Sequence, residues 1–129
     1  MEDRKAIRQS IFNRAYLGLK AQGFKVSATA GGKCMYRGPG GLKCAAGHLI
    51  PDDRYAFAME RRCASDVGTV YGFDIFGEGV TKEDENFLDN LQEAHDYPIN
   101  EGHDPGEECP TIEPHLRELA RRYNLEVPE

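Results

Sequence analysis

Four cysteines and four histidines are the side chains that could bind a metal or act as nucleophiles in this chain. No two of Cys34, Cys44, Cys63 and Cys109 have the C-x-x-C spacing of structural zinc sites and redox motifs. Cys34 and Cys44 could form a disulfide, bind zinc together with His48, or pack as two thiols. Because a cytoplasmic setting disfavours disulfides and free cysteine is usually buried, we expect packed thiols and no metal.

Two His-Asp pairs, at 95–96 and 103–104, suggest the paired ligands of metal-dependent hydrolases. Such sites need further ligands from separate helices, and the only histidine upstream of both pairs is His48. His95 falls on the apolar face of its expected helix, which indicates a buried histidine with satisfied hydrogen bonds. Cys44 could pair with either histidine as a nucleophile, but nothing local indicates an activated thiol. We therefore expect no catalytic residue.

The segment 33–45, KCMYRGPGGLKCA, predicts a β-hairpin around a glycine-rich turn. With a three-residue loop, Cys34 lies opposite Cys44 and Tyr36 opposite Leu42. Alternation then directs these four side chains toward the core. The basic side chains of the segment project from the other face.

An anion could bind on this basic face, which carries Lys33, Arg37 and Lys43 beside Tyr36 and the N–H groups of the turn. Arg37 offers a planar fork that suits phosphate, whereas the lysines act as point charges. The glycines fit neither a Walker loop nor a dinucleotide fingerprint, and the alternative is a solvated hairpin tip. If the anion site is real, Arg37→Ala should weaken binding with little effect on the melting temperature. Tyr36→Ala should instead lower stability.

The charges are divided unevenly along the chain. Residues 1–62 hold twelve Lys/Arg and five Asp/Glu, and residues 63–129 hold four Lys/Arg and seventeen Asp/Glu. One interpretation is that the halves attract each other in the folded monomer or in a head-to-tail oligomer. The other is a polar molecule with an anion-attracting face and a face for a cationic partner. An isoelectric point near 5.2 disfavours generic nucleic-acid binding.

The elements that must position these residues follow from hydrophobic periodicity. It predicts helices over 2–21, 51–62, from 81 onward, and 112–123, with 64–80 as a loop or irregular strand. Residues 97–110 are expected to form an acidic loop. In the first helix the arginines fall off the apolar stripe and are expected to stay in water.

We therefore predict an α+β fold, a single domain over 1–129 with about four helices around one short β-hairpin. A hydrophobic content of 40% suffices for a core without a metal. No apolar run approaches the roughly 18 residues of a membrane span, and the first residues lack a signal peptide's apolar stretch. These features predict a cytoplasmic protein without a membrane partner.

The stretch 34–55 contains C-x-Y-R, a glycine turn, G-L-K-C-A-x-G and L-I-P-D-x-x-Y. It resembles a group of small phage and bacterial proteins that share this motif and have no established activity. The matching residues are Cys34, Tyr36, Arg37, Gly41, Leu42, Lys43, Cys44, Ala45, Gly47, Leu49, Ile50, Pro51, Asp52 and Tyr55. The resemblance implies a shared fold and a phage or bacterial cytoplasmic setting, and it implies no mechanism.

Two functional hypotheses follow. The first is a non-enzymatic accessory protein that binds an anionic small molecule through Lys33, Tyr36, Arg37 and Lys43, for example by sequestering a nucleotide-type signal in an anti-defence role. The alternative is an acidic inhibitor or nucleic-acid mimic whose residues 74–108 face a basic protein surface. An enzyme comes third. No cofactor is expected, and a homo-oligomer is left open.

Overall fold

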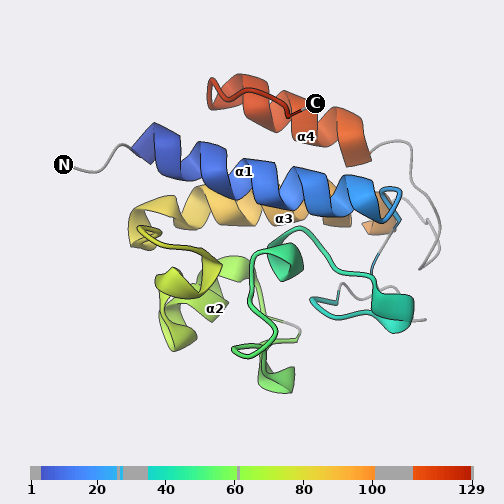
Figure 1. Cartoon of the computed structure of the whole chain (residues 1–129), viewed down its shortest axis with the longest axis vertical. Helices are drawn as coiled ribbons and strands as arrows, with labels where there is room; N and C mark the ends of the chain where they lie inside the picture. Colours follow the sequence, from blue (N-terminus) through green and yellow to red (C-terminus); the bar gives the residue numbers. More distant parts are fainter. Residues whose placement is uncertain (1–3, 26, 28–34, 61, 101–111, 129) are drawn as a thin grey trace.

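The computed structural model describes residues 4–25, 27, 35–60, 62–100 and 112–128 (Figure 1). The α-helices in this part of the chain are α1 (Arg4–Ala21), α2 (Ala64–Tyr71), α3 (Glu85–Asn100) and α4 (Ile112–Arg122). Short 3-10 turns cover Pro39–Gly41, Ala46–His48, Phe57–Met59, Phe73–Phe76 and Lys82–Asp84. No helix among the described residues is long and apolar enough to cross a membrane.

The helix α3 is central, because it packs against both α4 and α2. In Figure 1, α1 passes in front of α3 and below α4, and α2 lies below α3 with the short turns beside it. The core between them is apolar and well buried. Its largest fully buried side chains include Tyr16, Phe12, Phe76, Phe87, Ile11, Leu19, Met59 and Ile75.

The predicted first helix is confirmed over its described part. Its apolar stripe is buried at Ile11, Phe12, Ala15, Tyr16 and Leu19. The helix ends at Ala21, as predicted, and Gly23 follows with a φ of 72°, in the left-handed region that glycine adopts readily. There the Phe24 N–H donates to the Leu19 carbonyl at 2.8 Å, the bond that closes a Schellman motif.

The helices that begin near residue 81 and residue 112 are also confirmed. Thr81 and Asp84 form a reciprocal capping box ahead of α3, with the Thr81 N–H donating to Asp84 Oδ2 at 3.1 Å. The apolar face of α3 is buried at Phe87, Leu88, Leu91 and Ala94, and His95 is buried on the same face, as predicted. This helix reaches Asn100, so its end replaces the first residues of the loop expected over 97–110.

The predicted α+β class is wrong, because the described residues of 33–45 contain no strand and form no hairpin. The glycine-rich tip does turn, since the Gly38 N–H donates to the Leu42 carbonyl at 2.8 Å. The turn continues into a 3-10 segment and not into a strand ladder. Cys34 lies outside the described residues. Its expected position opposite Cys44 therefore lies outside them too.

Side chains from other segments take the place of the missing strand partner. The backbone N–H groups of Tyr36 and Arg37 donate to the two carboxylate oxygens of Glu60, at 2.9 and 3.1 Å. The Lys43 N–H donates to Gln22 Oε1 at 3.1 Å. Because these donors are satisfied by long-range side chains, the segment needs no β-ladder.

The second predicted helix, over 51–62, is also wrong. The described residues there form turns and one short 3-10 segment, and the apolar side chain of Ala58 is exposed. The helix instead begins at Ala64, inside the segment predicted as a loop. There α2 tolerates Gly68 because the Phe73 ring packs directly on it, where a Cβ would collide with the ring. Tertiary packing thus outweighs the low helix propensity of glycine.

Candidate functional site

The side chain of Arg37, the expected anion ligand, is already occupied within the chain. Its guanidinium donates to the carbonyls of Gly47 at 2.7 Å and Ile50 at 2.8 Å, and pairs with Asp52 at 3.0 Å. It also lies over the Tyr55 ring, 4.8 Å from the centroid. These contacts make Arg37 a brace for the segment that follows the glycine-rich turn.

The other predicted ligands separate in space. Tyr36 is buried as expected, with 2% of its surface exposed, and its hydroxyl donates to the Arg62 carbonyl at 2.5 Å. Lys43 Nζ lies 3.7 Å from the exposed Asp52 carboxylate, which Arg37 shares. Lys33 lies outside the described residues. The structure therefore brings Arg37 and Lys43 together around Asp52 and directs Tyr36 into the core.

Glu60, which sequence reasoning did not single out, organises this region. Besides the two backbone N–H groups, its carboxylate accepts the hydroxyl of Tyr55 at 2.5 Å. Burial and this bond to a carboxylate raise the pKa of Tyr55 to about 12. Glu60 therefore has a structural role, because its carboxylate binds two backbone N–H groups and one hydroxyl of the same chain.

The candidate metal and nucleophile residues also have structural surroundings. Cys44 is a buried free thiol, and the buried His95 accepts the Ser27 N–H at its Nε2, at 3.0 Å, as expected for a satisfied core histidine. The His48 ring contacts Gln22 Oε1 at 2.9 Å. Burial, together with neighbouring positive charges, lowers the pKa of His48 to about 4. Within the described ranges no three His, Cys, Asp or Glu side chains group as metal ligands.

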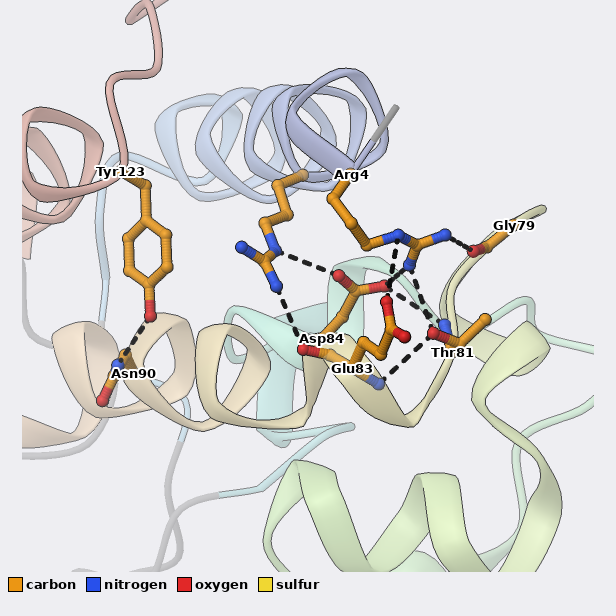
Figure 2. A network of polar contacts seen from close by, with 8 residues as sticks. Arg4, Gly79, Thr81, Glu83, Asp84, Asn90 and Tyr123 are labelled. Atoms are coloured by element: carbon orange, nitrogen blue, oxygen red, sulfur yellow. Dashed lines mark hydrogen bonds and ion pairs between the residues drawn. The ribbon is translucent and has the colours of Figure 1, made fainter. Parts of the chain in front are cut away.

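Two of the arginines on α1 surround one buried carboxylate (Figure 2). Asp84 is fully buried and pairs with Arg4 and, at 3.0 Å, with Arg8. Arg4 also donates to the Gly79 carbonyl at 2.9 Å. The expectation that the arginines of this helix stay in water is therefore wrong for these two, which have about a quarter of their side chains exposed.

Ion pairs connect the basic first half of the chain to the acidic second half. Arg4 and Arg8 from the basic half pair with Asp84 from the acidic half, and Arg54 pairs with Asp74 at 3.3 Å. These pairs agree with the interpretation that the two halves attract each other in the folded monomer.

A third arginine of α1 has different surroundings. Arg14 donates to the carbonyl of Phe76 and has no carboxylate partner in the part of the chain that the structure describes. Its side chain is exposed over much of its surface, and the partial desolvation of its guanidinium lowers its pKa. A cation that loses part of its hydration without gaining a counter-charge is less stable than a fully hydrated one, and a bound anion would relieve that cost.

Arg14 lies in a groove between α1 and the loop that precedes α3. The groove has a volume of about 540 Å³, within the roughly 300–1,000 Å³ of small-molecule sites. Its lining residues are Ala6, Ile7, Ser10, Ile11, Arg14, Gly77, Glu78, Gly79 and Val80. The helix contributes through Ala6, Ser10 and Arg14, whose spacing of four places them on one face. The sequence shows the spacing of these three residues, but it does not show which loop packs opposite them.

A second and smaller pocket, of about 200 Å³, lies between α3 and α4. Its charged lining residues are Glu93, Glu118 and Arg122, with His115 beside them. Arg121 already binds Glu118 in three hydrogen bonds, which neutralise part of the acidic charge of this pocket. The larger groove is the better candidate, because it has more room for a ligand and one carboxylate beside its arginine, whereas the smaller pocket has two.

Comparison with protein-family models, with curated proteins and with solved structures finds no match for this chain.

Proposed function

We propose that this protein is a non-enzymatic binding protein for an anionic small molecule and that Arg14 binds the anion. The observation that carries the proposal is the contrast among three arginines of one helix. Arg4 and Arg8 share the carboxylate of Asp84, whereas Arg14 has only the Phe76 carbonyl among described residues and lies in a groove.

The chemistry of the groove supports an anion as the ligand. A guanidinium has five N–H donors, and Arg14 uses one of its nitrogens for Phe76. The exposed Ser10, one turn earlier, adds a hydroxyl to the lining. An anion that meets this guanidinium forms charge-assisted hydrogen bonds, which are stronger than neutral ones.

The face with Arg37 and Lys43 stays the second place for the same function. An anion bound there would compete with Asp52 for Lys43 and with Asp52 and two carbonyls for Arg37. Arg14 has the Phe76 carbonyl as its one such competitor among the described residues and no carboxylate in direct contact, which is why we place the site there.

The alternative of an acidic inhibitor that uses residues 74–108 has less support. Asp74 and Glu83 are exposed but have arginine partners within the chain, at 3.3 and 3.8 Å. Their charge is partly neutralised before any basic protein binds.

An NMR titration with inorganic phosphate, acetate, AMP and cyclic AMP would test the proposal. At least one anion should shift the amide signals of Ser10, Gly77 and Gly79, and Arg14→Gln should weaken its binding at least tenfold. Ala6→Glu should have a similar effect, because it adds a carboxylate to the groove. Ala6 is exposed in the first helical turn, where a carboxylate does not destabilise the helix.

The matched controls separate the groove from the other basic face. Ala58→Glu adds the same charge at an exposed position outside the groove and should leave binding unchanged. Lys43→Gln should also leave it unchanged. The proposal is wrong if no anion binds, and the site is wrong if Lys43→Gln abolishes binding while Arg14→Gln does not.

A further inference from the structure

The lining of the groove restricts the anion further. Resting on the function proposed above, we infer that the ligand is a monocarboxylate with an apolar body, and not a nucleotide or another polyanion.

The charge of the lining points to a single negative charge on the ligand. Arg14 is the one base and Glu78 the one acid among the described residues that line the groove. A second negative charge on the ligand would find no second cation there and would be repelled by Glu78. The nearby Arg4 already contacts Gly79 and Asp84.

The remaining lining is mostly apolar. Ala6, which is exposed, and Ile7, which is half-buried, form an aliphatic wall of the groove, and the almost fully buried Ile11 and Val80 lie beneath it. A carboxylate group fills only a small part of about 540 Å³. Aliphatic groups on the ligand would gain free energy by leaving water for this wall.

The same lining disfavours a nucleobase. No aromatic side chain is among the described residues that line the groove. Proteins commonly hold bases by stacking them on aromatic rings or on arginine. Here the one arginine would already be engaged with the phosphate.

The inference is tested by a series of straight-chain carboxylates from butanoate to octanoate, measured by NMR titration of the intact protein. Affinity should rise about threefold with each added methylene, as expected when apolar area is buried. Hexanamide, which is a neutral analogue of hexanoate, should not bind. Hexyl phosphate, with the same chain and a higher charge, should bind more weakly than hexanoate, and Glu78→Gln should narrow that difference.

Variants of the wall test the apolar contact directly. Ile7→Gln places a polar amide at a half-buried position of the groove and should flatten the dependence on chain length. Leu17→Gln is the matched control, because Leu17 is an exposed apolar residue of the same helix outside the groove. Thermal unfolding of each variant shows that it is folded, and Ala6→Glu replaces Arg14→Gln if the latter is not.

The outcomes separate this inference from the proposed function. If AMP or phosphate binds more tightly than octanoate and depends on Arg14, the inference is overturned while the proposed function stands. The same holds if affinity is independent of chain length. If hexanamide binds as tightly as hexanoate, or if no anion binds, both are overturned.

Discussion

The backbone of Gly77 lies directly against the guanidinium of Arg14, so that a Cβ on Gly77 would collide with Arg14 Nη2. The glycine has a φ of 145° and a ψ of 161°, a region that only glycine occupies readily. The loop can therefore approach the arginine and offer it the carbonyl of Phe76, while the groove stays open beside them.

Replacing Gly77 by alanine should therefore lower both stability and binding. We expect a loss of about 1–3 kcal/mol in the free energy of unfolding, from backbone strain and the displaced arginine. Anion affinity should fall because Arg14 is pushed from its position. Urea unfolding and the titration described above measure the two effects.

Gly40→Ala is the matched control for Gly77. Gly40 also has a positive φ, of 71°, but nothing lies within 4 Å of the added Cβ. Gly40→Ala should lower the free energy of unfolding by about 1 kcal/mol, because of the backbone conformation alone, and should leave anion binding unchanged. Equal effects of both substitutions on binding would contradict the role given to the Gly77 contact.

Asp84→Asn should destabilise the fold strongly. The substitution leaves Arg4 and Arg8 without the buried carboxylate they share and removes the charge from the capping box (Figure 2). Breaking such a pair costs about 3–5 kcal/mol, and we expect the lower end because both arginines are partly exposed. Chemical denaturation measures the change.

The neighbouring carboxylate supplies the control for Asp84. Glu83, with 76% of its side chain exposed, lies 3.8 Å from Arg4. Glu83→Gln should cost less than about 1 kcal/mol, as exposed ion pairs do. Similar costs for the two substitutions would show that Asp84 does not organise this end of α1.

Arg37→Ala should lower the stability of the fold, contrary to the sequence-based expectation of a nearly unchanged melting temperature. The guanidinium holds the carbonyls of Gly47 and Ile50, and its removal leaves both without these donors. We expect a loss of about 2 kcal/mol. Tyr36→Ala should cost about 3 kcal/mol through the lost core ring.

Lys43→Ala is the control, because its contact to Asp52 is long and exposed. It should cost less than about 0.5 kcal/mol. A melting temperature unchanged by Arg37→Ala would restore Arg37 as a candidate ligand.

The helices could be predicted from the sequence because their signals are local. The apolar stripe of α1, its end at Gly23, and the capping box of Thr81 and Asp84 all depend on residues within a few turns. The hairpin was predicted wrongly because its donors are satisfied by Glu60 and Gln22, which lie far away in the sequence.

The candidate site was harder to predict than the helices, because it depends on contacts between residues that are far apart in the sequence. A sequence shows that Arg4, Arg8 and Arg14 lie off the apolar stripe, but not which carboxylates reach them. Only the packing of the loop before α3 assigns Asp84 to the first two and leaves Arg14 facing a groove. The prediction missed α2 for a different reason, because Gly68 lowers the helix propensity of this segment and the sequence does not show that the Phe73 ring packs on it.

His48 should make the protein less stable in mild acid. Its ring packs against α1 where Gly18 leaves room, 2.5 Å from the position a Cβ would take, and contacts Gln22. Burial, and then the charges of Lys43, His95 and Arg37, lower its pKa from 6.5 to about 4.

The direction of the effect follows from this lowered pKa. Between about pH 6.5 and pH 4 the unfolded chain binds a proton at His48 that the folded chain does not, so stability falls as the pH falls through this window. Because the ring is partly exposed, we expect a loss on the order of 1 kcal/mol between pH 7 and pH 5. Urea unfolding at both pH values should show a smaller difference for His48→Gln than for the natural chain. An unchanged difference would assign the acid sensitivity to other groups.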